Sequence, residues 1–312
     1  MAGAVDRLKQ KADAFQRRNR PIGFIYGVIK KSGDDKGSHL AALITYYGFF
    51  SLFPLLLVAF TVLGYVLSGN PSLRNDVSDT INQRLPIPGI SADTISGSGL
   101  ALVVGIVLTL WSGLGATQVA QDALNTVWDV PRGQQPSFIA KRLAGLITLL
   151  VIGAGLIVAT GASSAVSFLG PGAALGGLAI SAVTNAAIMA VLFRVMVERE
   201  LGWSEVFPGA LFGGVAWTVL QSLGGWYTNR LIDNADKTYG TFAVVIGLLS
   251  WIYLQCLVFI YAAEISSVKA RGLWPRALVV DDPTDADRSV LNAIIERARP
   301  YVPALDDAAQ DG

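Results

Sequence analysis

Cysteine, histidine and charge are all scarce in this sequence. Its 312 residues include one cysteine, Cys256, and one histidine, His39. A single thiol cannot form a disulfide within the chain, and a single histidine excludes a zinc hydrolase built on several histidine ligands. The sequence also lacks a G-x-x-x-x-G-K-[ST] phosphate loop and a G-x-S-x-G nucleophile turn. We therefore expect no enzyme, with no catalytic residue, no metal and no cofactor, and any transport has to be driven without ATP.

Charged residues make up only 15% of the chain, whereas 52% of its residues are hydrophobic. The mean hydropathy of +0.50 is too high for an ordinary soluble domain of this size. The formal net charge of +1 provides no field that would attract nucleic acid, so we expect no nucleic-acid partner. The composition instead predicts an integral membrane protein that has lipids as its immediate partners. It leaves a homo-oligomer open.

Six apolar runs are long enough to cross a hydrocarbon core of about 30 Å as helices. If consecutive runs alternate in direction, 20 of the 24 lysines and arginines fall on the side that holds both termini. By the positive-inside rule, that side is the cytoplasm. We therefore predict an all-α, polytopic membrane protein of six transmembrane helices with cytoplasmic N- and C-termini. The runs cover residues 40–67, 99–120, 143–168, 174–197, 206–227 and 241–267.

The charge pattern divides the chain into three segments. In the first, DRLKQKADAFQRRN has helical spacing of apolar residues and is expected on anionic headgroups, with a solvated arm as the alternative. IGFIYGVIKK, after Pro21, is too short to span and is expected along the interface. A helix is predicted between Thr284 and Pro300. Another is predicted near 77–85, in the loop that joins the first and second apolar runs on the side opposite the termini. The segments are a basic arm (1–38), a transmembrane domain (39–272) and an acidic cytoplasmic tail (273–312).

The first apolar run contains polar groups and a proline, in the stretch TYYGFFSLFPLLL at 45–57. Pro54 has no amide hydrogen and so leaves a backbone carbonyl without its helical partner. Tyr47, Ser51 and Pro54 are spaced i, i+4 and i+7, on one helix face, and neighbouring protein or cavity water has to satisfy such a face. We interpret it, with Tyr46, as the lining of a cavity. The alternative is a packed proline kink with the tyrosines in an aromatic belt.

A second polar stripe lies at the end of the second run. Gln118, Gln121, Asp122 and Asn125 are spaced i, i+3, i+4 and i+7. If all four polar side chains of this face pointed at lipid, the free-energy cost would be several kcal/mol. The stripe is interpreted as a vestibule at the inner mouth of a pathway. An amphipathic exit onto the membrane surface is the alternative.

Glu264 is the third polar feature, in the last turns of the sixth run. Arg194 and Glu198, near the end of the fourth run, are spaced i, i+4 and can pair with each other or with Glu264 and Asp122. Both a structural ion-pair cluster and a proton relay fit this pattern.

These features coincide with a set of short motifs: Ala41-Ala42, Tyr46-Tyr47, Ser51-Leu52-Phe53-Pro54, Asn125, Trp203, Pro208-Gly209-Ala210, Trp217, Tyr239-Gly240, Trp251, Tyr253 and Ala263-Glu264. Together they resemble the BrkB/YihY family of bacterial inner-membrane proteins, once described as ribonuclease BN. The resemblance covers about residues 20–272. It implies a six-helix, multi-pass protein of the bacterial inner membrane, with associations to envelope function and to export of lipid or solute. Ribonuclease activity is not expected, because no segment supplies the histidines and acids that metal-dependent RNA cleavage uses.

The leading hypothesis is a non-ATP-driven transporter or permease for a lipid or small solute. In it, the polar face of the first run and the polar groups of the second and sixth runs line the pathway. The alternative is a membrane scaffold that binds envelope or division partners through the arm and the tail. A membrane enzyme with Asp122 and Glu264 as an acid/base pair is a third interpretation, but no nucleophile accompanies them.

Overall fold

The protein folds entirely into helices in the part of the chain that the structure describes. The computed structural model describes residues 2–67, 99–131, 138–167, 174–238, 241–279 and 282–298, without strands in these ranges. The predicted all-α fold is confirmed, while the expected helix near 77–85 lies outside the described residues. In chain order the helices are α1 (Ala2–Arg18), α2 (Arg20–Asp34), α3 (Gly37–Leu67), α5 (Gly99–Val127), α6 (Phe138–Ser167), α7 (Ala174–Met196), α8 (Trp203–Thr238), α9 (Thr241–Arg271) and α10 (Asp285–Ala298).

Five of these helices contain a stretch that is long and apolar enough to cross a membrane, so the chain is a polytopic membrane protein. The run predicted at 143–168 corresponds to α6, which is not among the five in the described residues. A total of six spans and the cytoplasmic location of both termini therefore stay predictions. The five stretches are Gly37–Val58 in α3, Leu102–Val127 in α5, Gly176–Met196 in α7, Trp203–Gly224 in α8 and Val245–Arg271 in α9.

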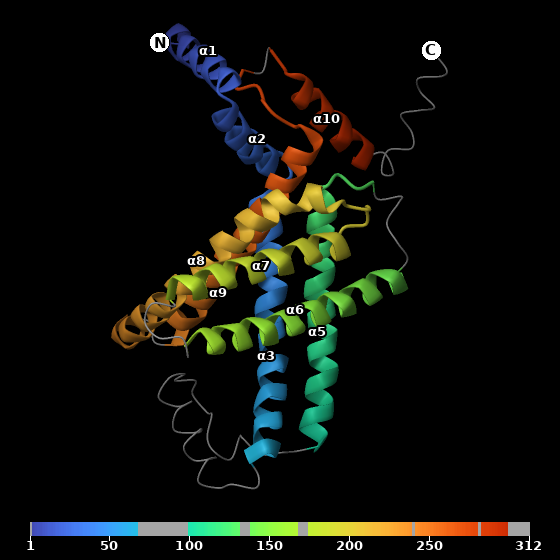
Figure 1. The fold of residues 1–312 in the computed structure, drawn as a ribbon, viewed down its shortest axis with the longest axis vertical. Coiled ribbons are helices and arrows are strands. Elements are labelled where there is room, and N and C mark those ends of the chain that lie inside the picture. The colour runs from blue at the N-terminus through green and yellow to red at the C-terminus, as the bar shows by residue number, and fades with distance from the viewer. Residues whose placement is uncertain are drawn as a thin grey trace.

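The long helices form two groups. α3 and α5 run side by side along the longest axis of the molecule, and α7, α8 and α9 pack against one another at an incline to them (Figure 1). α6 crosses α5 and packs on α7, while α9 contacts α3 as well as α8 and so connects the groups. The surface of these helices is apolar. Val103, Val183 and Val219 are 60%, 67% and 53% exposed, as positions that face lipid should be.

Glycines set the close contacts of α8 with its neighbours. A Cβ on Gly209 would lie 1.7 Å from the Ala262 carbonyl oxygen, so only glycine fits there. A Cβ on Gly214 would lie 2.5 Å from the Ala186 backbone nitrogen of α7. The Ser266 hydroxyl of α9 accepts the Gly209 N–H at 3.0 Å. Small residues thus bring the backbones together, as expected where helices associate within lipid.

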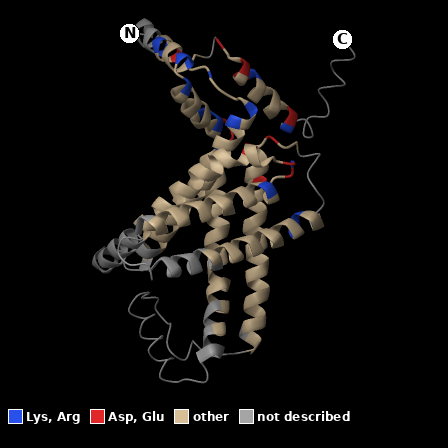
Figure 2. Cartoon of the chain, viewed as in Figure 1, with Lys and Arg blue, Asp and Glu red and all other residues tan. Residues whose placement is uncertain are grey.

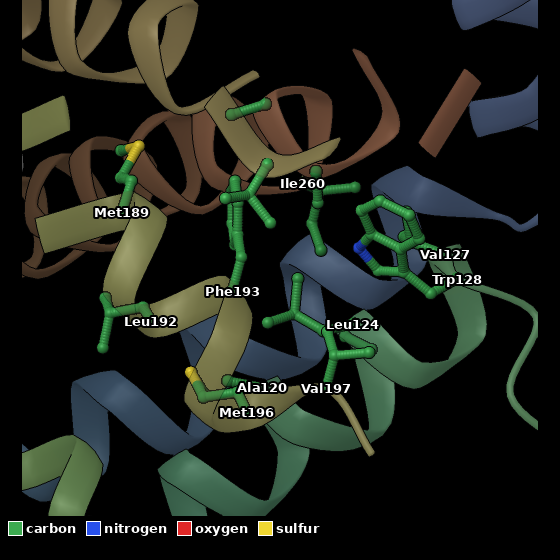
Figure 3. Close-up of a cluster of buried hydrophobic side chains, with 14 of the residues drawn as sticks. Ala120, Leu124, Val127, Trp128, Met189, Leu192, Phe193, Met196, Val197 and Ile260 are labelled. Carbon is green, nitrogen blue, oxygen red and sulfur yellow. The ribbon is translucent and has the colours of Figure 1, made fainter. Parts of the chain in front are cut away.

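The buried apolar core lies at one end of the spans. Figure 3 shows Leu124, Val127 and Trp128 from α5 and the residue after it facing Phe193 of α7 and Ile260 of α9. The charged residues of the described chain gather at the same end, in the arm, the tail and the adjoining helix ends (Figure 2). We call this the arm end of the spans.

The arm and the tail pack against each other at this end. The Gln16 side-chain amide donates to the Arg276 carbonyl at 2.5 Å, and the Asp13 carboxylate accepts the Leu278 N–H at 2.7 Å. α2 lies so close to Trp274 that a Cβ on Gly27 would come within 2.9 Å of the Trp274 Cβ. Sequence reasoning does not predict this contact. We call α1, α2, the segment after α9 and α10 the arm–tail unit.

Asp287 is the centre of the arm–tail unit. Its carboxylate accepts hydrogen bonds from Lys30 at 2.8 Å and from Arg276 at 2.6 Å. It also accepts the Ala277 N–H at 2.8 Å and the Thr284 hydroxyl at 2.7 Å. Thr284 in turn accepts the Asp287 N–H and so caps α10. Burial disfavours the charged carboxylate, but these donors hold the pKa of Asp287 well below its usual range.

Asp287→Asn should loosen α10. The neutral amide accepts fewer of these bonds, and loss of a charge-assisted hydrogen bond costs about 1.5–3 kcal/mol. Hydrogen exchange measured by mass spectrometry on the reconstituted protein should show faster exchange across α10. Asp285→Asn is the matched control, because Asp285 is exposed at the start of the same helix.

From the lowered pKa of Asp287 we also predict that α10 loosens in acid. Folding lowers the pKa of Asp287. The stabilisation that its carboxylate gives to the folded state is therefore fully present above the ordinary aspartate pKa of about 3.9, and it is lost as the pH falls through the folded-state pKa. The protection of the α10 amides in the wild type, corrected for the pH dependence of intrinsic exchange, should therefore fall below about pH 3.9. Asp287→Asn should lack this step. Identical exchange profiles for wild type and variant at every pH would contradict the assignment of Asp287 as the centre.

Gly209→Ala should destabilise the bundle. Forcing an extra carbon against the Ala262 carbonyl separates α8 from α9, and overpacking of this kind costs about 1–3 kcal/mol. The measurement is the temperature at which the purified protein loses its monodisperse elution in detergent. Gly48→Ala is the control, because nothing lies within 4 Å of a Cβ at that position of α3. Equal midpoints for the two variants would show that the α8–α9 contact has no such constraint.

Candidate functional site

The carboxyl end of α5 carries the candidate site. After α5 the chain turns at Asp129, which has a left-handed φ of 53°, and the Val130 N–H returns to the Asn125 carbonyl at 2.9 Å. This turn leaves the Val127 carbonyl free to accept side-chain donors, and the Thr126 carbonyl accepts Arg297 in addition to the Asp129 N–H of the turn. Cations are favoured at such a helix end by the helix dipole.

Six ionisable side chains from four parts of the chain gather at this turn, and we call them the arm-end charge cluster. The side chains of Lys31 and Asp35 are 0% exposed, that of Asp129 is 2% exposed and Glu264 is 0% exposed. Charges buried this deeply have to neutralise one another. The cluster comprises Lys31 and Asp35 of α2, Asp129 after α5, Glu264 and Arg271 of α9, and Arg297 of α10.

The two aspartates hold all three cations of the cluster. Lys31 pairs with Asp35, and its Nζ lies 3.3 Å from Asp129 Oδ2. Arg297 bridges the same two acids, at 2.8 Å from Asp35 Oδ1 and 3.0 Å from Asp129 Oδ1. Arg271 pairs with Asp129. The arm, the spans and the tail are therefore tied together by one set of ion pairs.

Glu264 is enclosed by this cluster but bonded to none of it. Lys31, Asp35, Asp129 and Arg297 are its charged neighbours. Neither carboxyl oxygen has a hydrogen-bond partner among the described residues. The next two hydroxyls along α9, those of Ser266 and Ser267, donate instead to carbonyls of α8 and α5. A buried carboxyl without a donor is costly, so the fold retains it at the expense of stability.

A second polar set, which we call the Lys141 group, lies on another face of α5. The Lys141 ammonium is 3.2 Å from Asp122 Oδ1 and 4.0 Å from Glu198 Oε1. Gln121 donates to the Lys141 carbonyl at 3.5 Å, and the Glu198 N–H donates to the Asn125 side-chain carbonyl at 2.9 Å. Burial raises the pKa of Glu198, although Lys141 opposes this effect. The group comprises Gln121, Asp122, Asn125, Lys141 and Glu198.

A hollow of about 630 Å³ lies beside Glu198 and is lined by Arg194 and residues 197–202. Arg194 donates to the Leu201 carbonyl at 2.8 Å, and its guanidinium lies 4.3 Å from the centre of the Trp203 ring. The expected pairing of Arg194 with Glu198 is therefore replaced by these contacts. The nearest cation to Glu198 is Lys141.

The polar residues predicted on the first span lie elsewhere. Tyr46 and Tyr47 are 57% and 42% exposed and pack edge to face with each other. The Ser51 hydroxyl donates to the Gly48 carbonyl at 2.7 Å, and α3 continues as one helix through Pro54. No described hydrogen bond, ion pair or ring contact joins these side chains to the polar groups of α5 or α9. A cavity shared by all of them stays a prediction.

Among the other predicted residues, Gln121 and Asn125 are 1% exposed, as membrane-depth polar groups sheltered by protein should be. Gln118 is half-buried, and Asp122 is exposed beside Lys141. Asp122 and Glu264 thus belong to different sets, with different partners. Within the described residues, no group of three or more His, Cys, Asp or Glu side chains is arranged to hold a metal ion.

Sequence reasoning missed most of the charge cluster. Lys31 and Asp35 have the i, i+4 spacing of a helical ion pair, which is a usable signal. Asp129 and Arg297 give no such signal in the sequence, because charged residues are common both in the polar connection after α5 and in the polar tail. Only their meeting in space makes them notable.

The chain resembles known proteins over most of its length. The family model described as "Virulence factor BrkB" matches residues 28–276. The putative ribonuclease-like protein YfkH of Bacillus subtilis is 26% identical over 79% of this chain and 95% of its own length. The inner membrane protein YhjD of Escherichia coli is 24% identical, over 84% and 86%. A UPF0761 membrane protein of Ralstonia nicotianae is 26% identical, over 88% and 65%. No solved structure matches.

The matched range contains all five candidate spans of the described residues and five of the six members of the charge cluster, and two of the three bacterial relatives are named as membrane proteins. The chain is therefore a multi-pass protein of the bacterial inner membrane and belongs to the Virulence factor BrkB family.

Proposed function

We propose that this protein is a non-ATP-driven transporter or permease for a lipid or a small solute, and that it is not an enzyme. The observation that carries the proposal is Glu264, a carboxyl group that lies in a membrane span, is 0% exposed and has no hydrogen-bond donor. Ionisable groups in spans are rare and mark ion or substrate pathways.

The neighbours of Glu264 give it a means of acting on the rest of the molecule. A change in its charge changes the electrostatic balance of Lys31 and Arg297, which hold the arm and the tail to α5. Proton uptake or cation binding at Glu264 would therefore change the strength of the contacts between α2, α5, α9 and α10. In the proposed carrier, this coupling links the charge of Glu264 to an alternation between two states, which a carrier driven by a gradient needs.

The Lys141 group provides polar side chains on the other face of α5. Gln121 and Asn125 are buried there, and Glu198 borders the open hollow at the end of α7. Both carboxyl oxygens of Glu198 lack a hydrogen-bond partner among the described residues. Polar groups buried at the end of a span in this way can form the mouth of a pathway.

Reconstitution into vesicles tests the proposal. Dithionite bleaching of fluorescent phosphatidylglycerol measures lipid translocation, and light scattering after addition of a polyol measures solute entry. Wild-type vesicles should exceed protein-free vesicles in one of the two assays. Glu264→Gln keeps the size of the side chain but removes its charge, and its rate should fall close to that of protein-free vesicles, without the pH dependence of the wild type.

Glu296→Gln is the matched control, because Glu296 is exposed on α10 and has no described partner. It should transport like the wild type. Tyr47→Phe tests the predicted pathway face of α3 separately, with a reduced rate expected. Wild-type rates equal to those of protein-free vesicles in both assays would remove the proposal, and undiminished transport by Glu264→Gln would remove Glu264 from it.

The scaffold alternative has an observation of its own. Hydrogen bonds and ion pairs hold the arm–tail unit together, and α10 turns Leu291 and Ile295 outward at 57% and 53% exposure, one helical turn apart. Deleting the arm or the tail cannot test this alternative, because both contribute to the buried contacts at the arm end. Leu291→Ser with Ile295→Ser leaves those contacts in place. Loss of cellular function with unchanged vesicle transport would favour a scaffold.

A further inference from the structure

α2 has an apolar stripe that nothing in the described chain covers. Ile22, Ile25 and Ile29 are spaced i, i+3 and i+7 and are 39%, 58% and 54% exposed. The opposite face of α2 is buried and includes Gly23, Gly27, Val28, Lys31 and Ser32. In Figure 1, α10 and the segment after α9 lie on one side of α2 and leave its other side open.

The membrane begins next to this stripe. α2 ends at Asp34, and α3, with its first span, begins at Gly37, so only two residues separate them. The exposed apolar surface resumes on α3 with Leu43 and Tyr46, at 52% and 57% exposure. A short, strongly amphipathic helix joined directly to a span has the properties of a helix that lies in the membrane interface.

The charges around α2 indicate which lipid the stripe meets. Arg18 and Lys36 are exposed, and neither of them has an acidic partner in the described part of the chain. The acids nearby are already engaged. Asp13 pairs with Arg17, Asp34 with Arg276, and Asp35 with Lys31 and Arg297, within the protein. The free charge beside the stripe is therefore positive, which complements anionic headgroups.

We propose that α2 is an in-plane anchor, with the Ile22, Ile25 and Ile29 stripe in the lipid and Arg18 and Lys36 on the headgroups of anionic phospholipid. The buried face of the same helix carries Lys31 of the arm-end charge cluster. Anchoring therefore fixes the position of Lys31 relative to Asp129 and Glu264. This anchoring does not depend on transport.

The test uses the full chain in nanodiscs of phosphatidylcholine, with or without phosphatidylglycerol. Cys256 is the only cysteine and is buried, so Cys256→Ala gives a background for single labels. An environment-sensitive fluorophore on Ile25→Cys is compared with one on Leu291→Cys of α10, since the two positions are 58% and 57% exposed. The label at position 25 should emit at shorter wavelength and be quenched by quenchers attached to the lipid. The label at position 291 should not.

Phosphatidylglycerol should increase the quenching at position 25. The combined change Arg18→Gln and Lys36→Gln should reduce this preference, by about fivefold per cation, while emission at position 291 stays the same. Equal emission at both positions in both kinds of disc would overturn the proposal. Lipid-independent shielding at position 25 would also overturn it, because protein would then cover the stripe. Quenching without a phosphatidylglycerol effect would overturn the anionic-headgroup assignment.

Discussion

The neutralisation of buried charge at the carboxyl end of α5 is the constraint on which the arm end of the structure depends. Lys31 and Asp129 are almost completely buried, and removing one partner of such a pair costs about 3–5 kcal/mol. Their partners come from segments far apart in sequence, with Arg297 lying after the last span. The arm, the spans and the tail therefore cannot move independently without separating buried charges.

The transmembrane part of the fold was predictable because lipid imposes a simple rule. A span has to satisfy its backbone internally, so long apolar runs become helices, and the predicted runs coincide with α3, α5, α6, α7, α8 and α9. The helix bounds differ most where polar residues continue a helix beyond the hydrocarbon, as at the end of α8. The packing of α1 and α2 on the tail was not predictable. It depends on contacts such as Gln16 with the Arg276 carbonyl, which no periodicity reveals.

The same rule explains which site residues could be found. Gln121, Asn125 and Glu264 are polar side chains within apolar runs, so composition alone marks them, and each is buried. Tyr46 and Tyr47 carried the same signal, but an aromatic ring with a polar end is also stable in an exposed position, and both side chains are exposed. Asp35, Asp129 and Arg297 lie in polar segments where charge is ordinary. Their burial arises from tertiary structure.

Arg297 belongs to the arm-end charge cluster but lies outside residues 28–276, the range that the family model matches. Within residues 28–276, Lys31 and Arg271 face the three acids Asp35, Asp129 and Glu264, and the third cation comes from α10. Without that arginine the cluster would hold an excess negative charge whenever Glu264 is ionised. A chain that shares these five residues but lacks α10 therefore needs a cation from elsewhere or a protonated acid. The tail helix is thus part of the electrostatic balance of the spans.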